Sequence, residues 1–284
     1  MKISTQTCVL ANIFGDKKTI EMLADIGYDC IDYSMFGSKT ESPLFGDGFE
    51  KYALELKHIA DESGISFNQT HAPFPSYKAG NEEYNKKTLP MIIRSIIITS
   101  ILGAKYVIVH PTAIKENQKE FNLNFFNGLI PACKEYNVVV ALENMFGSNQ
   151  NNGQIIANVC STGKEFCEYL DELDPQYFTA CLDTGHAGLV GETAANMIKT
   201  LGHNRLKALH VHDNNHLRDL HTLPFTQSLN WQEIMAALKE IDYTGEFTFE
   251  ADNFIKGFPE EMAEAASKFM LETGRYLVGL CGQR

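Results

Sequence analysis

Strand-like runs and helical patterns alternate along this whole sequence of 284 residues. The eight predicted strands are Lys2–Cys8, Cys30–Tyr33, Ile65–His71, Tyr106–His110, Val138–Glu143, Thr179–Asp183, Ala208–His212 and Glu246–Glu250. Helical patterns, with apolar residues at three- and four-residue spacing, cover Lys17–Ile26, Phe49–Ser63, Asn81–Leu102, Asn122–Tyr136, Gly163–Leu173, Thr193–Leu201, Trp231–Ile241 and Glu260–Val278. Such repeated βα units predict a parallel sheet covered by helices.

The predicted strands include continuous apolar runs such as Val107–Val109 and Val138–Leu142, which are typical of strands buried on both faces. Gly27, Gly64 and Gly103 each follow a helical pattern, where a left-handed C-cap residue is favoured.

Eight βα units with nothing left over predict a closed (β/α)8 TIM barrel that forms one domain over residues 1–284. An open, doubly wound sheet is the alternative. No G-x-G-x-x-G or P-loop sequence follows the first strand, which weakens the nucleotide-binding form of that alternative.

The charge and the apolar pattern exclude several classes of protein. The formal net charge is −12, which repels a phosphate backbone and argues against nucleic-acid binding. We find no signal-peptide core and no apolar stretch near the roughly 20 residues that a membrane span needs. The seven cysteines include no C-x-x-C pair, so the simplest interpretation is free thiols in a reducing cytoplasm. The few arginines are scattered: Arg94, Arg205, Arg218, Arg275 and Arg284.

Polar residues end six of the predicted strands. Because the carboxyl ends of barrel strands meet at one face, these side chains are expected to lie together. Clustered buried carboxylates repel one another unless a cation compensates them, so the pattern favours a metal site. The six residues are His71, His110, Glu143, Asp183, His210 and Glu250.

Three carboxylates and one imidazole are the expected metal ligands. Glu143, Asp183 and Glu250 supply the carboxylates, and either His210 or His212 supplies the imidazole, since both face the same side of one strand. This oxygen-rich set suits Mn²⁺, Mg²⁺ or Co²⁺ and is also compatible with Zn²⁺.

The chain resembles the xylose isomerase-like barrels, a superfamily that includes sugar epimerases, inosose dehydratases and endonuclease-IV-type repair enzymes. The resemblance spans nearly the whole chain and rests on motifs in a fixed order. These motifs are Thr70-His71-Ala72-Pro73, Val109-His110-Pro111, Leu142-Glu143-Asn144, Leu182-Asp183-Thr184-Gly185-His186, His210-Val211-His212-Asp213, Asp219-Leu220-His221 and Phe249-Glu250.

The resemblance to the ketose 3-epimerases implies that one divalent metal is held by Glu143, Asp183, His210 and Glu250. The family's His-x-x-acid pattern selects His210, with Asp213, over His212. It also implies that His186 contacts a substrate hydroxyl. The remaining expected substrate contacts are His71, His110, His212 and Arg218.

The implied function is that of a metal-dependent isomerase or epimerase acting on a small sugar or sugar phosphate. A metal ion can stabilise an enediolate as a Lewis acid. Glu143 and Glu250 are then expected to exchange the proton as general base and acid. Family members form dimers or tetramers, which implies a homodimer or homotetramer.

The chain departs from the epimerase pattern at two loops and at the arginine that epimerases carry shortly after strand seven, which corresponds to about His216, with Arg218 nearby. One of the loop departures favours a rival function. Asn144–Gly147 is closer to the loop of the endonuclease-IV-type enzymes, and Pro224–Ser228 lacks the epimerase glycines. An enzyme of that repair type, a phosphodiesterase acting on DNA, would use three zinc ions. Their ligands would be His71, His110 and Glu143 for the first; Glu143, Asp183, His210 and Glu250 for the second; and His186, Asp219 and His221 for the third.

A barrel that binds a sugar or metal without catalysis is a further alternative, but it has no need of two acid–base groups beside a cation.

Four aromatic residues allow two interpretations, either packing or contact with a sugar. They are Phe14, Phe36, Phe45 and Trp231.

Overall fold

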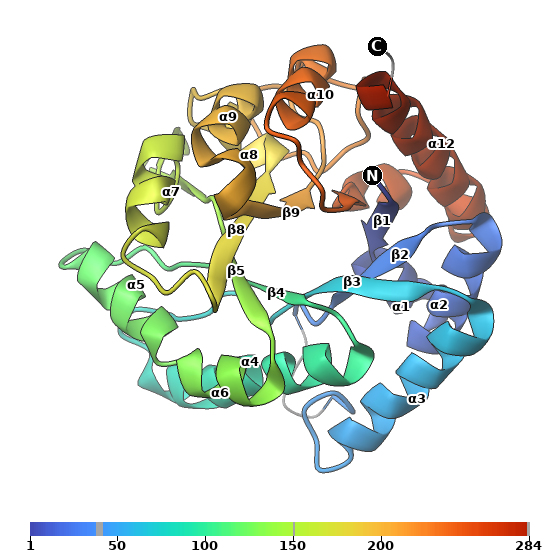
Figure 1. Ribbon diagram of the computed structural model, residues 1–284, viewed down its shortest axis with the longest axis horizontal. Coiled ribbons are helices and arrows are strands. Elements are labelled where there is room, and N and C mark those ends of the chain that lie inside the picture. The colour runs from blue at the N-terminus through green and yellow to red at the C-terminus, as the bar shows by residue number, and fades with distance from the viewer. Residues whose placement is uncertain (38–41, 150, 283–284) are drawn as a thin grey trace.

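The structure, a computed structural model, describes residues 1–37, 42–149 and 151–282. Eight parallel strands lie side by side in the order β10-β1-β2-β3-β4-β5-β8-β9, and helices surround them (Figure 1). The strands are β1 (Ile3–Gln6), β2 (Cys30–Ser34), β3 (Ser66–His71), β4 (Tyr106–Val109), β5 (Val139–Glu143), β8 (Phe178–Asp183), β9 (Leu206–His210) and β10 (Phe247–Phe249).

The two outer strands of this order approach each other and nearly close the ring. Val211, just beyond β9, forms a parallel bridge with Phe249 of β10. Its N–H donates to the Thr248 carbonyl over 2.8 Å, and its own carbonyl accepts from the Glu250 N–H over 3.1 Å. The predicted TIM barrel is therefore confirmed.

The helices form an outer layer around the strands (Figure 1). None of the described helices has the length and apolar composition that crossing a membrane requires. Their bounds are α1 (Cys8–Phe14), α2 (Asp16–Ile26), α3 (Phe49–Ser63), α4 (Glu82–Leu102), α5 (Gln118–Asn127), α6 (Ile130–Tyr136), α7 (Gly163–Leu170), α8 (Thr184–Leu189), α9 (Ala194–Arg205), α10 (Trp231–Glu240), α11 (Asp252–Lys256), the 3₁₀ helix η1 (Glu260–Met262) and α12 (Ala263–Gly282).

The structure corrects several predicted elements. The first strand ends at Gln6, and α1 begins at Cys8, a residue that the prediction placed in the strand. The single helix predicted over Asn122–Tyr136 is two helices, because the chain turns after α5 and Pro131 occupies the first turn of α6, where its missing N–H is not needed.

Short elements also lie where none was predicted. An antiparallel hairpin of β6 (Phe146–Ser148) and β7 (Ile155–Ala157) follows β5, and the single-turn helices α8 and α11 follow β8 and β10. The predicted C-caps are confirmed: Gly27, Gly64 and Gly103 have φ of 103°, 72° and 76°, a left-handed conformation that costs glycine little.

Residues of the barrel strands alternate between two environments. In β4, Val107 and Val109 belong to the large core between strands and helices, whereas Ile108 belongs to a separate buried cluster. That cluster lies inside the barrel, on the side formed by β4, β5, β8 and β9, because successive side chains on a strand point to opposite faces. Its other members are Ala141, Cys181 and Ala208.

Candidate functional site

The alternation along the strands brings all six polar strand-end residues to one end of the barrel, facing inward. Glu143 stands two positions after Ala141, and Asp183 stands two positions after Cys181, so each shares its neighbour's inward face. The same rule places the remaining members of the set, which are His71, His110, His210 and Glu250.

Four of these residues converge into what we call the inner group: Glu143, Asp183, His210 and Glu250. One potential ligand atom of each lies within 4.8 Å of the others. His210 Nδ1 is 3.1 Å from Glu143 Oε2 and 3.2 Å from Glu250 Oε2. All four are buried, and Glu250, at 8% exposure, is the most accessible. The structure thus brings together the four residues that the sequence predicts as ligands of one metal.

A second set of side chains adjoins Glu143. His110 Nε2 lies 2.7 Å from Glu143 Oε2, and His71 Nε2 lies 3.2 Å from His110 Nε2. One atom from each of these three residues could serve a common cation. Glu143 therefore links this pair of imidazoles to the other members of the inner group.

A third set, the outer group, consists of His186, His212, Asp219 and His221. Asp219 Oδ2 is 2.9 Å from His221 Nε2 and 3.7 Å from His186 Nε2. The ring of His212 stacks on that of His221 with centroids 4.0 Å apart, and its Nε2 lies 2.9 Å from Asp183 Oδ1. His212 thus joins the outer group to the inner one.

Local hydrogen bonds explain why the two motifs Leu142-Glu143-Asn144 and Asp183-Thr184-Gly185-His186 occur together. The Asn144 amide donates to the Asp183 carbonyl over 3.0 Å and accepts from the Asp183 N–H over 2.7 Å, tying β5 to β8. Asp183 Oδ1 accepts from the His186 N–H over 2.7 Å and so caps α8. At Gly185 a Cβ would lie 1.9 Å from the His212 ring, so only glycine fits there.

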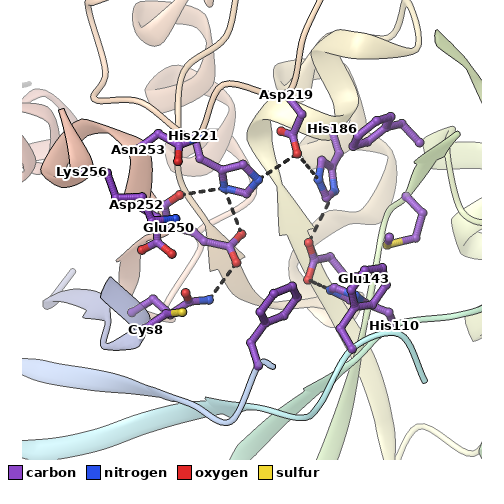
Figure 2. Close-up of a pocket in the computed structure, with 15 residues that line it drawn as sticks. Cys8, His110, Glu143, His186, Asp219, His221, Glu250, Asp252, Asn253 and Lys256 are labelled. Atoms are coloured by element: carbon purple, nitrogen blue, oxygen red, sulfur yellow. Dashed lines mark hydrogen bonds and ion pairs between the residues drawn. The ribbon is translucent and has the colours of Figure 1, made fainter. Parts of the chain in front are cut away.

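A cavity of about 460 Å³ opens over these groups. Figure 2 shows Glu143 and Glu250 on opposite sides of it, with His186, Asp219 and His221 beyond them. Apolar residues line part of the wall, and the rings of Phe36 and Phe74 stack there at 5.5 Å. Polar residues of α11 line another part, as Figure 2 shows: Asp252, Asn253 and Lys256.

The two glutamates have opposite electrostatic character in the metal-free protein. Burial disfavours the charge on Glu143, but His110 and His210 beside it outweigh burial and hold its pKa well below the usual range. Burial dominates at Glu250 and raises its pKa to about 8, although His210 and His221 oppose the shift. At neutral pH one carboxyl is therefore ionised and the other is mostly protonated.

The chemistry of the site fits a bound divalent cation. Three carboxylates are crowded among imidazoles, and several buried ring and carboxylate atoms lack a well-directed hydrogen bond within the described residues. These atoms are His110 Nδ1, His210 Nδ1 and Asp219 Oδ1. His210 Nδ1 is directed at two carboxylates and has the position of a ligand atom.

Three predicted substrate contacts lie away from the cavity surface. His71 and His212 are 1% and 0% exposed and stand behind the residues that line the cavity. Arg218 is exposed and does not line it either, because its loop carries Asp219 inward and leaves the arginine outside. By contrast, His110 and His186 do line the cavity.

The aromatic residues divide between the two interpretations. Phe36 lines the cavity, whereas Phe45 is buried in the core and Phe14 packs against it. Trp231 is also buried, and its ring N–H donates to Asp213 Oδ2 over 3.1 Å. Asp213 therefore anchors the start of α10, and Trp231 has a packing role.

Two further buried polar residues, on the first two strands, contact the inner group without having been predicted from the sequence. The Gln6 amide donates to Glu250 Oε1 over 2.7 Å, and Asp32 Oδ2 lies 3.1 Å from His210 Nε2. Both face inward by the same alternation, and that regularity was the available signal. Neither belongs to a motif that marks metal binding, so they were overlooked.

Comparisons with known proteins agree with this architecture. A family model described as xylose isomerase-like TIM barrel matches residues 20–273. An uncharacterised protein of Methanocaldococcus jannaschii is 25% identical over 246 residues, which cover 83% of this chain and 78% of that protein. A D-psicose 3-epimerase of Enterocloster bolteae is 24% identical over 243 residues, which cover 81% of this chain and 74% of the epimerase.

Solved structures share the fold. The IolI protein, crystallised with a bound zinc atom, superposes with a TM-score of 0.77 at 18% identity, and 98% of each chain is covered.

Proposed function

Because this chain belongs to the xylose isomerase-like TIM-barrel family, we propose that it is a divalent-metal-dependent sugar isomerase or epimerase. The observation that carries the proposal is the pair Glu143 and Glu250, which lie on opposite sides of the cavity. An acid and a base on opposite sides of a bound sugar suit the removal of a proton from one face and its return on the other.

The proton next to a sugar carbonyl is too weakly acidic for a carboxylate to remove unaided at neutral pH. A divalent cation held by Glu143, Asp183, His210 and Glu250 would supply Lewis acidity, which stabilises the negative charge on the sugar oxygens. Glu143 would accept the proton on one face of the sugar, and Glu250, on the opposite side of the cavity, would return a proton to the other face. His186, at the cavity surface, is placed to contact a hydroxyl.

The cavity and the relatives support a sugar as substrate. Phe36 and Phe74 offer apolar faces on which the C–H face of a sugar ring can pack, and the carboxylates and imidazoles opposite can bond to hydroxyls. The D-psicose 3-epimerase acts on a ketose, by its name, and the IolI protein binds zinc. Both properties are proposed here for this chain.

Solvent hydrogen exchange tests the proposal without knowledge of the product. The Mn²⁺-loaded protein is incubated in D₂O with a panel of ketoses and ketose phosphates, and proton NMR follows loss of the signal beside the carbonyl. We expect exchange with at least one sugar, and in Glu143→Gln the loss of exchange with the epimer whose proton Glu143 removes. A metal-loaded protein that exchanges no proton of any sugar in the panel would overturn the proposal, and a tightly bound but unexchanged sugar would favour a non-catalytic barrel.

A second candidate function is that of a phosphodiesterase with three metal ions. One observation favours it. His71 and His110 lie on one side of the inner group and the outer group lies on the other, so that potential ligands for three cations adjoin one another. The net charge of −12 opposes DNA as substrate. Counting bound metals by anomalous scattering, together with an assay on DNA that contains an abasic site, tests this candidate. Three ions with strand cleavage would favour it over the isomerase.

A further inference from the structure

Polar side chains fill one half of the barrel interior below the inner group. Asn68 Oδ1 accepts from Ser4 Oγ over 2.7 Å, and the Asn68 amide donates to Thr248 Oγ1 over 3.1 Å. The same amide reaches Gln69 Oε1 over 3.3 Å. Barrel interiors are ordinarily packed with branched apolar residues, so this half of the interior has a different role from the apolar half.

An irregularity in strand pairing lets two adjacent residues join this network. Between β2 and β3 the register moves from Ile31 opposite Phe67 to Asp32 opposite Gln69, which leaves Asn68 as an extra residue. A bulge of this kind changes the direction of a side chain. As a result Gln69 as well as Asn68 points into the barrel, and the Gln69 amide donates to Asp32 Oδ2 over 2.9 Å.

Asp32 connects this network to the inner group. It is fully buried, and its Oδ2 lies 3.1 Å from His210 Nε2, while its Oδ1 has no hydrogen-bond partner among the described residues. A buried carboxylate is costly and contributes little to packing. Its position is therefore best explained by what it does to His210.

We propose that Asp32 is a positioning residue that fixes the orientation and tautomer of His210 for metal binding, an inference that rests on the metal site of the proposed function. Asp32 accepts the Nε2–H of His210. When a cation is bound, the single imidazole proton is thereby held on Nε2, and the lone pair of Nδ1, on the side of Glu143 and Glu250, is available to the cation. Gln69 in turn holds the Asp32 carboxylate, so the ring of His210 is fixed before a cation arrives.

The test compares Mn²⁺ binding by the wild-type protein, Asp32→Asn and a matched control, Asp16→Asn, by isothermal titration calorimetry. Asp16 is a suitable control because its Oδ2 also accepts two side-chain hydrogen bonds, from Tyr33 and Tyr52 at 2.9 Å and 2.8 Å, but it contacts none of the inner group. An asparagine at position 32 can donate to Nε2 and move the ring proton to Nδ1. We expect Asp32→Asn to weaken Mn²⁺ binding by about 10- to 100-fold and Asp16→Asn to leave it unchanged.

A spectroscopic readout separates positioning from a general loss of packing. The visible absorption of the Co²⁺-loaded protein reports the ligands of the ion, and we expect it to change in Asp32→Asn and not in Asp16→Asn. Equal affinity and equal spectra in the wild type and Asp32→Asn would overturn the inference and leave the proposed function standing. A wild-type protein that binds neither ion would overturn both.

If Asp32→Asn fails to fold, Gln69→Met replaces it, and a several-fold loss of Mn²⁺ affinity is expected because Asp32 loses its support. Unchanged affinity in Gln69→Met would then overturn the inference.

Discussion

The two sides of the cavity carry the same functional group in different surroundings. On one side Glu143 is surrounded by imidazoles, with His110 at 2.7 Å, His210 at 3.1 Å and His186 at 3.4 Å. On the other side the shortest contact of Glu250 is with the neutral amide of Gln6. In the metal-free protein, burial at Glu143 is outweighed by His110 and His210, which hold its pKa well below the usual range, whereas burial dominates at Glu250 and raises its pKa to about 8.

The difference originates in the strand that ends next to each glutamate. β5 lies beside β4, after which His110 follows, whereas β10 lies beside β1, which ends at Gln6. Identical side chains therefore acquire unlike pKa values, in part from the neighbouring strand. The following predictions test whether that asymmetry controls the reaction.

Removal of the cation is expected to have the largest effect on turnover, because proton transfer by Glu143 and proton transfer by Glu250 both depend on it. After rigorous chelation, sugar turnover should fall by more than about 10³-fold, and Mn²⁺ or Co²⁺ should restore it. A coupled assay of the chelated and reconstituted protein makes the measurement. Unchanged turnover in protein shown to be metal-free would mean that the two carboxyls suffice alone.

The substitution Glu143→Gln removes the carboxylate that is ionised in the metal-free protein. Turnover is expected to fall by about 10³-fold, since loss of a general base typically costs 10²- to 10⁴-fold. The amide oxygen can still approach a cation, so calorimetry should detect bound Mn²⁺. Turnover within threefold of wild type would contradict the assignment of Glu143 as the base.

Glu250→Gln removes the protonated side and should reduce net conversion by about 10²-fold. Glu143 remains, however, so one epimer should still exchange its proton with D₂O without conversion into the other. Proton NMR on each epimer separately measures this asymmetry. If neither epimer or both epimers exchanged, the two sides would not have the distinct roles assigned to them.

The affinity for Mn²⁺ should depend on pH through the protonation of Glu250. Its pKa of about 8 in the metal-free protein is above the usual value of 4.5, so it is protonated at pH 7 and must lose that proton to act as a ligand. Affinity for Mn²⁺ should therefore fall as pH falls below 8, by up to about tenfold per unit. Calorimetry at pH 7 in buffers of different ionisation enthalpy should detect proton release on binding, and its absence would mean that Glu250 is already ionised.

The sequence was sufficient for the barrel and for the convergence of its strand ends. Apolar runs and helical periodicity are properties of many residues at once, and the rule that parallel strands end at one face placed His71 beside His110 without further information. The roles of these side chains as ligands or acid–base groups stay predictions.

Other features depend on contacts that the local sequence does not encode. The hairpin β6–β7 has strands of three residues, too short for a periodic signal. Arg218 was predicted at the site because it lies near the position of an epimerase arginine, but in the structure it is exposed. The hydrogen bond from Gln69 to Asp32 depends on a bulge in β3, and a bulge is a property of strand pairing that is visible only once both strands are in place.

The alternation of the strands also determines which kinds of change the protein can survive. Two positions before each of Glu143, Asp183 and His210 lies a small residue that also faces into the barrel. Inserting or deleting one residue inside such a strand would turn its functional side chain out toward the helices and bring an apolar neighbour into the site. We therefore expect the loops at this end of the barrel to tolerate many substitutions. An insertion or deletion within the strands that lead to Glu143, Asp183 and His210 should instead disrupt the site.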